Sequence, residues 1–421
     1  MKMRICVQDL KKSILYFIFV LIMVMFTDTL WIRNVTMNRF YIVIGIGIVS
    51  FLCAMIHCTS KKLITLSMLG VPIILSMLFN LDLNTLVFFK LAIIAFGWAL
   101  AVSVDIKKLI NCYISLILFI SIFSLVCMIF RDSIISMNFI PTIDSGHYGT
   151  KALFFTNVKI GTGNLYFIRN QGPFWEPGAY QAYLNIALMF LLFGNIERKH
   201  KTLEIVILCI TVVSTISTTG YIVLGILMIA RLFTNDHSSV RNKVFIAFVA
   251  ILVVIIVINN ETINYLLFDK MDVTSSNNIS SATRQYSIMQ NINGILSDPI
   301  FGIAPQKYAA LFAQSTSAFG EVSVGVNTTT SLSVWALYGI VYFIVFNLGL
   351  FYFSKSMKHT LFVTILLFVA LLVIYNSESM NYSLFFNFLP ILGYYKKGGD
   401  LFENSRYNNC IQQKRENTES N

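Results

Sequence analysis

The stretch of the chain from residue 169 to 184 places a guanidinium and a carboxylate at the start of an apolar run. It reads RNQGPFWEPGAYQAYL, with Arg169 seven residues before Glu176 and with Trp175 next to the carboxylate. Pro177 suits the first turn of a helix, because its missing N–H would have no partner there. The helix dipole also favours a carboxylate at that point. Glu176 is therefore either a helix cap, with Trp175 as an interfacial anchor, or a functional group at the membrane surface.

A second polar stretch has the signals of a helix followed by the start of another apolar run. The segment SSATRQYSIMQNINGILSDPIFGIAP has serines at an N-cap position and SDP beyond the repeat, which predicts a helix over about 282–295. Arg284 and Ile288 would share one face of this helix, because they are four residues apart. Asn327 follows in VGVNTTTSLSVW, where an Asn before an apolar run most often caps a helix.

The composition identifies an integral membrane protein. Hydrophobic residues make up 56% of the 421 residues and charged residues only 12%, whereas soluble globular proteins carry about 25% charged residues. A chain this apolar cannot cover itself with polar surface, so we expect an all-α, polytopic membrane fold. The net charge of +11 does not indicate a nucleic-acid partner, because no basic run is interleaved with aromatic residues.

Twelve apolar runs are interpreted as membrane spans, each of which needs about 20 apolar residues. The expected spans cover residues 13–31, 40–58, 63–80, 85–104, 109–130, 179–194, 202–217, 219–233, 243–259, 329–353, 359–375 and 380–395. Two long segments divide them into three groups. Spans 1–5 lie in 1–130, spans 6–9 in 179–259 and spans 10–12 in 329–395; the long segments are 131–178 and 260–328. Long loops are usually functional or disordered, and these two contain aromatic and aliphatic residues, so we expect the chemistry there.

The basic residues predict the orientation of these spans. With the N-terminus in the cytoplasm, most of the 31 Lys and Arg residues fall in inner segments, and the short outer turns 81–84, 218 and 376–379 have none. An even number of spans returns the C-terminus to the cytoplasm, where we expect the basic tail 396–421 to be disordered. Both long segments then lie on the extracytoplasmic face.

Few residues inside the expected spans are ionisable. Asp28 lies near the outer end of the first span, and Lys90 lies in the fourth, where it can extend toward an interface. A proton- or sodium-coupled transporter would carry more such groups, so this pattern argues against transport. The seven cysteines form no CxxC pair and predict no disulfide, and the sequence predicts no metal and no cofactor.

Three segments, in this order, resemble the O-antigen polymerase and O-antigen ligase superfamily of bacterial envelope glycosyltransferases. They are RNQGPFWEPGAYQAYLN, TRQYSIMQNINGILSDPIFGIAP and VGVNTTTSLSVWALYGIVYF. The expected topology, with two large outer loops, is also similar. The chain departs from an Arg-x10-Gly pattern of some members, because Arg284 stands ten positions before Gly294 instead of eleven. The histidine of the ligases is missing from the second loop, and Asn327 stands at a similar place, which favours a polymerase over a ligase.

The resemblance implies an enzyme in the bacterial cytoplasmic membrane whose active face is extracytoplasmic. It would join undecaprenyl-pyrophosphate-linked oligosaccharide repeat units into the O-antigen of lipopolysaccharide or into capsular polysaccharide. A sugar hydroxyl of the acceptor would attack the anomeric carbon of the donor, and the lipid pyrophosphate would leave. The implied partners are membrane lipid, a chain-length regulator and a flippase. The alternatives are a ligase-type transferase and a flippase or exporter of the same lipid-linked oligosaccharide, which would be expected to have short outer loops.

The resemblance also implies roles for the polar residues of the long segments. Arg284 and Arg169 would bind pyrophosphate oxygens, because a guanidinium binds them bidentately and keeps its charge. Glu176 would either accept the proton of the attacking hydroxyl or orient Arg169; the second role is favoured, because a helix N-terminus lowers the basicity of a carboxylate. Tyr180 would line the site and Asn327 would bind the acceptor sugar. The expected site comprises the catalytic residues Arg284, Arg169 and Glu176 and the substrate-binding residues Tyr180, Asn327 and Trp175.

Overall fold

The computed structural model describes most of the chain. The described residues are 2–34, 38–56, 60–144, 149–161, 168–234, 279–313 and 327–395. The expected ninth span, 243–259, and the C-terminal tail, 396–421, lie outside them, as does part of the second long segment.

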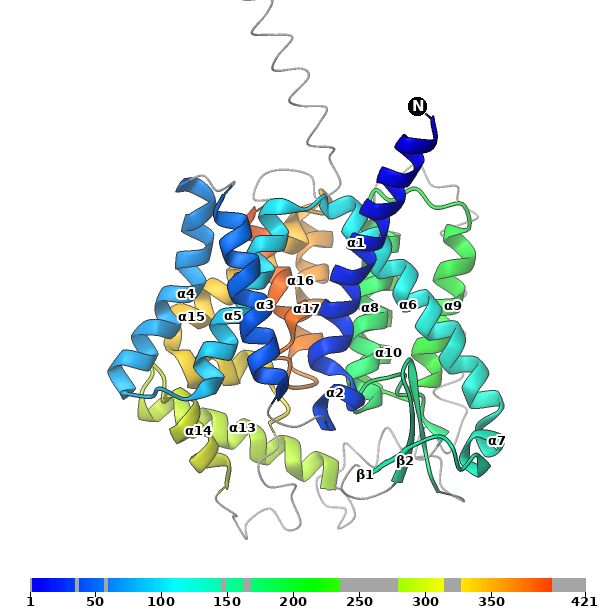
Figure 1. Ribbon diagram of the computed structural model, residues 1–421. Helices are drawn as coiled ribbons and strands as arrows, with labels where there is room; N and C mark the ends of the chain where they lie inside the picture. Colours follow the sequence, from blue (N-terminus) through cyan, green and yellow to red (C-terminus); the bar gives the residue numbers. More distant parts are fainter. Residues whose placement is uncertain are drawn as a thin grey trace, which may run out of the picture.

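A bundle of helices forms the body of the molecule (Figure 1). Its helices are α1 (Lys2–Asp28), α3 (Asn38–Met55), α4 (Ser60–Asn80), α5 (Thr85–Ser103), α6 (Ile106–Ile129), α8 (Pro177–Phe193), α9 (Lys201–Ser214), α10 (Thr218–Leu232), α15 (Thr330–Lys355), α16 (Leu361–Tyr375) and α17 (Leu384–Tyr395). Each expected span within the described residues coincides with one of these helices. The expectation of a mostly helical fold is therefore confirmed.

The lengths and surfaces of the helices are those of a membrane protein. Four described stretches, Leu63–Asn80, Thr85–Ser103, Ile106–Ile129 and Thr330–Lys355, are long and apolar enough to cross a bilayer. Large apolar side chains also face outward, as in α3, where Val49 is 61% exposed. Such exposed apolar faces suit a lipid environment rather than water. The full set of twelve crossings stays a prediction.

The described parts of the two long segments gather at one end of the bundle (Figure 1). The helices α13 (Ile279–Ser297) and α14 (Ala304–Ala313) lie there, together with α7 (Arg131–Ser136), the short helix α2 (Leu30–Asn34) and a small sheet. The N-terminus of α1 lies at the opposite end. We call the end of the bundle that carries α13, α14 and the small sheet the α13 end. The predicted helix over 282–295 is confirmed by α13.

The small sheet corrects the expectation of an all-α fold. Strands β1 (Thr142–Asp144), β2 (Gly149–Leu153) and β3 (Thr156–Lys159) pair antiparallel in the order β1-β2-β3. A two-residue turn joins β2 to β3, so that Leu153 pairs with Thr156. The strands are too short to give a clear period-two pattern in the sequence. A pair of strands alone would be only marginally stable, and the third strand makes the sheet more stable. The sheet is tied to the segment before α8, because the Asn157 N–H donates to the Gly172 carbonyl at 2.7 Å.

The helix α15 is broken at Gly339, and the segment that follows α13 fills the break. Gly339 has φ 80° and ψ 176°, which a side chain would strain. The Ile340 N–H donates to the Pro299 carbonyl at 2.9 Å, and the Ile303 N–H donates to the Ala336 carbonyl at 2.8 Å. The PIFG stretch, which is part of the family resemblance, therefore joins α13 to α15.

Side chains of α4 satisfy one carbonyl near the break in α15 and one in the segment that fills it. The Ser76 hydroxyl donates to the Leu337 carbonyl at 3.0 Å, and the Asn80 amide donates to the Gly302 carbonyl at 2.8 Å. Non-helical backbone at membrane depth is tolerated only where protein groups or water satisfy it. Hydrogen bonds to α4 and α15 thus join the α13 end to the bundle.

Candidate functional site

The turn between α16 and α17 is polar and largely buried at the α13 end. Residues 376–383 read NSESMNYS, and we call them the polar turn. Ser377, Glu378, Asn381 and Ser383 are each less than 9% exposed. Buried polar groups are costly unless they are hydrogen-bonded, so their partners show how this end of the molecule is organised.

One set of partners comes from the start of α15. The Thr330 hydroxyl donates to the Glu378 carbonyl at 2.8 Å and accepts from the Met380 N–H at 2.7 Å. The Asn381 amide donates to the Ser333 hydroxyl at 2.6 Å. The first turn of α15 and the polar turn therefore form one hydrogen-bonded unit.

A second set comes from the first turns of α8, a helix whose every residue is buried. The Gln181 amide donates to the Ser377 hydroxyl at 3.3 Å. The Glu378 carboxylate lies against Gly178, in the space where a side chain at that position would be. A carboxylate is favoured beside the N-terminus of a helix. Glu378, which the sequence analysis did not single out, therefore joins Glu176 at the N-terminus of α8.

Lys90 provides a buried cation beneath the polar turn, which corrects the expectation that it extends to an interface. It is fully buried, and its Nζ donates to the Asn381 carbonyl and to Asn387 Oδ1, both at 2.7 Å. The ammonium also lies 5.8 Å and 5.5 Å from the ring centroids of Tyr338 and Tyr342. Carbonyl oxygens and aromatic faces replace water around the charge. Lys90 therefore supports the polar turn from inside the bundle.

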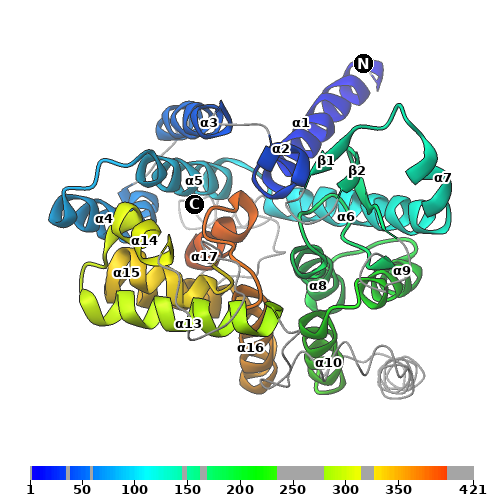
Figure 2. The ribbon, with the colours of Figure 1, turned by 90° about the horizontal axis from the view of Figure 1, so that it is seen from below.

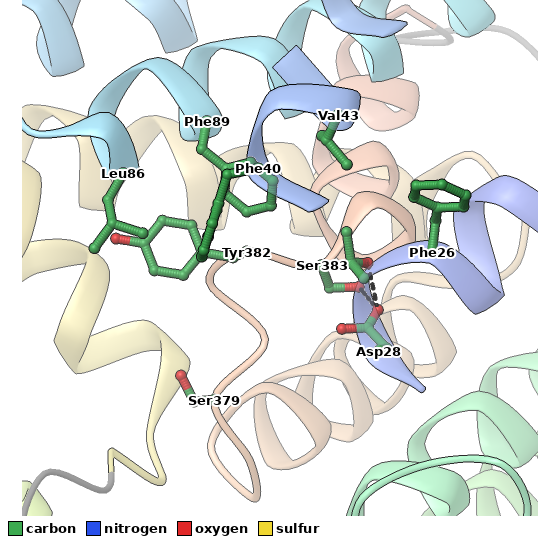
Figure 3. Close-up of a pocket in the computed structure, with 10 residues that line it drawn as sticks. Phe26, Asp28, Phe40, Val43, Leu86, Phe89, Ser379, Tyr382 and Ser383 are labelled. Atoms are coloured by element: carbon green, nitrogen blue, oxygen red, sulfur yellow. Dashed lines mark hydrogen bonds between the residues drawn. The ribbon is translucent and has the colours of Figure 1, made fainter. Parts of the chain in front are cut away.

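A cavity of about 390 Å³ lies beside the polar turn, between the end of α1 and the starts of α3 and α5 (Figure 3). Its lining combines aromatic and aliphatic side chains with hydroxyls and one carboxylate. The lining residues are Phe26, Thr27, Asp28, Phe40, Val43, Leu86, Phe89, Ser379, Tyr382 and Ser383.

Asp28 links this cavity to α8 and to the polar turn. Its Oδ2 accepts hydrogen bonds from the Thr27 hydroxyl at 3.0 Å, from Ser383 and from Tyr183. The carboxylate is only 3% exposed. Figure 3 shows Asp28 and Ser383 on one side of the cavity, with Phe40 and Tyr382 on the other. The cavity thus carries a buried negative charge that three hydroxyl donors hold in place.

Asn327, one of the site residues expected from the sequence, lies at the centre of a hydrogen-bond network. Its Oδ1 accepts from the Ser287 hydroxyl at 3.0 Å and from the Asn291 amide at 3.1 Å, both on α13. Its Nδ2 donates to the Thr329 carbonyl at 3.1 Å and to the Ser379 hydroxyl at 3.2 Å. Thr329, and not Asn327, is the N-cap of α15, so the expected capping role of Asn327 is wrong. Asn327 instead joins α13 to the polar turn.

The hydrogen-bond network extends from α13 to α14. The Tyr308 hydroxyl donates to Asn291 Oδ1 at 2.9 Å, and burial raises the pKa of Tyr308 well above its ordinary value. The phenol therefore stays protonated and keeps its donor role at neutral pH.

Arg284 is exposed on α13, three residues before Ser287. It makes no hydrogen bond or ion pair with any residue that the structure describes, and Ile288, one turn further on, is also exposed. Because Ser287 and Asn291 hold α13 to Asn327, the guanidinium projects from a helix whose position is fixed. Its charge is therefore accessible to a ligand.

Arg169 and Glu176 lie on the segment that leads into α8. The Arg169 Nε donates to the Thr215 carbonyl, between α9 and α10, at 3.1 Å. Glu176 is exposed at the N-cap of α8, where its backbone is extended and its side chain makes no capping hydrogen bond. No ion pair joins Glu176 to Arg169, although both lie within the described residues. The structure therefore does not pair them, and the side-chain cap expected for Glu176 is not formed.

Tyr180 does not lie where a substrate contact was expected, whereas the contact expected for Trp175 stays a prediction. Tyr180 is completely buried; its hydroxyl lies 3.1 Å from that of Ser124, and its ring stacks on Phe174 with centroids 5.6 Å apart. Its ring closes against Gly172, whose φ of 52° needs a glycine. Tyr180 thus belongs to the core and does not line the cavity. Trp175 is half-buried and packs against the edge of that core.

Neither the polar turn nor Asp28 is among the site residues expected from the sequence. The available signal was NSESMNYS, a stretch rich in hydrogen-bonding side chains between two strongly apolar runs. This stretch is short and carries no basic residue, so the sequence predicts only a simple outer turn there. Its burial depends on contacts with α1, α8 and α15, which are distant in the sequence.

No protein-family model and no curated protein sequence matches this chain. The class that the fold defines is a helical membrane protein with a polar, partly buried site at one end of its bundle.

Proposed function

We propose that this chain is a membrane-embedded glycosyltransferase that polymerises undecaprenyl-pyrophosphate-linked oligosaccharide repeat units. One observation carries the proposal: the three segments that resemble the O-antigen polymerase superfamily all meet the polar turn or α13. The first contacts the turn through Gln181 and Ser377, and the second and third meet at Asn327, which reaches Ser379. Residues far apart in the sequence thus converge on one place, as the parts of an active site do.

The proposed reaction needs a membrane-bound donor and an acceptor at the same surface. A hydroxyl oxygen of the acceptor sugar forms a bond to the anomeric carbon of the donor glycan. The bond from that carbon to the lipid pyrophosphate breaks, the pyrophosphate keeps the electron pair, and the hydroxyl proton passes to a base. Undecaprenyl chains hold donor and acceptor in the bilayer, so a site at the end of the helices can reach the pyrophosphate groups of both.

Arg284 supplies the positive charge for the leaving group in this proposal. An exposed guanidinium on a fixed helix can bind two phosphate oxygens at once and stabilise the charge that develops as the bond breaks. Loss of one such donor costs about 2.7–4 kcal/mol of transition-state stabilisation in other enzymes. Arg169, held at the turn between α9 and α10, is the second candidate for the same pyrophosphate.

The carboxylates divide between surface and interior. Glu176 is exposed and stands at the end of the central helix α8, which suits a group that accepts the proton of the attacking hydroxyl. Glu378 is buried against α8 and fits a structural role better. Because no ion pair joins Glu176 to Arg169, the roles proposed for these two residues are independent of each other.

The glycan profile of a strain that lacks the chain tests the proposal. We expect surface glycan with a single repeat unit in the deletion strain and long chains when the wild-type protein is restored. Arg284→Ala should give the single-repeat profile, whereas Met289→Ala, at another exposed position of α13, should give long chains. If surface glycan is lost altogether in the deletion strain, an exporter is the better interpretation. If long chains persist on the lipid carrier but are not transferred, a ligase is the better interpretation.

A further inference from the structure

The cavity beside the polar turn has the composition of a site for a small polar ligand. Its volume of about 390 Å³ falls within the range of roughly 300–1,000 Å³ that is typical of small-molecule sites. Such sites are mostly apolar and contain a few placed polar groups that orient the ligand. Here the polar groups include the Asp28 carboxylate and the hydroxyls of Ser379 and Ser383.

The hydrogen-bonding pattern suits a ligand with several hydroxyl groups. A carboxylate offers about four acceptor positions, and Asp28 Oδ2 is already fixed in place by Tyr183 and Ser383. The Ser379 hydroxyl accepts from the Asn327 amide, so its own proton can be donated to a ligand oxygen. A sugar hydroxyl both donates and accepts, and it can therefore pair with each of these groups.

Aromatic rings form another wall of the cavity. The Phe89 ring packs edge-on against Phe40, with centroids 4.8 Å apart, and lies 5.8 Å from the Tyr382 ring. Aromatic side chains offer a large apolar surface, and the C–H faces of a sugar ring can pack on such a surface. Phe40 and Tyr382 face Asp28 and Ser383 across the cavity (Figure 3). Apolar rings and hydrogen-bonding groups in one cavity match the two kinds of surface of a pyranose ring.

The charge of the cavity excludes the other parts of the proposed substrate. Among the residues whose side chains the structure describes, the lining includes the Asp28 carboxylate and no Lys or Arg, so these groups would repel a pyrophosphate. A polyprenyl chain has no polar atom that could pair with the carboxylate and the hydroxyls of this lining, so the lining does not suit it. A neutral sugar satisfies both conditions.

We infer that this cavity binds the acceptor sugar, with Asp28 and Ser379 as its hydrogen-bonding partners and Asn327 as the residue that positions Ser379. The inference rests on the proposed function and adds to it a separate place for the acceptor. The family resemblance implies that Asn327 contacts the acceptor sugar directly. In the structure its amide reaches the cavity through Ser379.

Binding measurements on the full chain in lipid nanodiscs test this inference. The two probes are the undecaprenyl-pyrophosphate-linked single repeat unit, purified from the deletion strain, and undecaprenyl pyrophosphate without sugar. Val43→Phe fills the cavity, because Val43 lines it and is buried; Val49→Phe, on the exposed face of the same helix, is the matched control. Ser379→Ala removes one hydroxyl with little change in volume.

We expect Val43→Phe to weaken binding of the repeat unit by about tenfold or more, and Ser379→Ala by about fivefold, with sugar-free lipid bound equally by all variants. If both probes weaken together, the cavity holds the lipid pyrophosphate and the inference is wrong. It is also wrong if the Ser379→Ala and Val43→Phe variants bind the repeat unit as the wild type does. If the wild type binds neither probe, the proposed function itself fails.

Discussion

The carboxylate of Glu378 occupies the space that a side chain on Gly178 would take. A Cβ built on Gly178 would lie 3.0 Å from the Cδ atom and 3.3 Å from the Cγ atom of Glu378, and closer still to its Oε1. This relationship presses the polar turn directly against the first turn of α8. It explains why a glycine follows Pro177 at the start of a helix that is buried along its whole length.

Gly178→Ala should therefore separate the polar turn from α8. We expect a loss of about 1–3 kcal/mol in the free energy of unfolding, the usual cost of overpacking, measured by thermal unfolding in detergent. Gly225→Ala is the matched control, because a Cβ at that position in α10 meets nothing within 4 Å. Adding Glu378→Ala to Gly178→Ala should recover part of the loss. If the double variant is no more stable than Gly178→Ala, the two residues are not in contact.

Lys90 should be more important for stability than its single charge suggests. In Lys90→Met the Asn381 carbonyl and Asn387 Oδ1 lose their shared donor, and each unsatisfied buried group costs about 1–3 kcal/mol. Lys199→Met, at an exposed position before α9, should change stability by less than about 0.5 kcal/mol. The two melting temperatures, measured in the same detergent, provide the comparison. Equal effects would show that Lys90 does not support the polar turn.

Asp28 should tolerate loss of its charge better than loss of its oxygens. Asp28→Asn keeps an oxygen that can accept from Tyr183 and Ser383, whereas Asp28→Ala leaves both hydroxyls without that acceptor. We expect Asp28→Ala to lower the free energy of unfolding by about 1–3 kcal/mol more than Asp28→Asn. Tyr183→Phe, combined with Asp28→Ala, should reduce the difference, because one orphaned donor is gone. Identical stability of the two single variants would show that these hydrogen bonds are not made.

Asn327 should control how firmly α13 is held. In Asn327→Ala the Ser287 hydroxyl and the Asn291 amide lose a common acceptor, so α13 should open more often from the bundle. Amide hydrogen exchange should rise in α13 and stay unchanged in α9, which lies on another side of the bundle. Unchanged exchange in α13 would mean that the PIFG segment and α15 hold this helix without Asn327.

The positions of the helices followed from the sequence because length and apolarity are local properties. Each expected span within the described residues is a helix, and α13 was predicted from its serine cap and the SDP stretch at its end. The sheet was not predicted, since β1 has only three residues. The break of α15 at Gly339 was also not predicted, because it depends on the PIFG segment from elsewhere in the chain.

The site was predicted less well because burial is a property of the whole fold. Arg284 and Asn327 lie at the α13 end as expected, one exposed and the other at the centre of a hydrogen-bond network. Tyr180 looked accessible because it stands one turn after Glu176, yet packing of α6 and Gly172 around it makes it part of the core. In the sequence Asp28 is an isolated charge in a span. Its partner Ser383 lies more than 350 residues later, so only the fold shows their hydrogen bond.

Synthesis by the purified protein tests the central claim most directly. The wild-type chain in lipid nanodiscs would receive the undecaprenyl-pyrophosphate-linked single repeat unit as its sole substrate. We predict lipid-linked products of two, three and more repeats, with one undecaprenyl pyrophosphate released for each bond formed, and no elongation by Arg284→Ala. Unchanged single repeats with the wild-type protein, under conditions in which it binds them, would contradict the account.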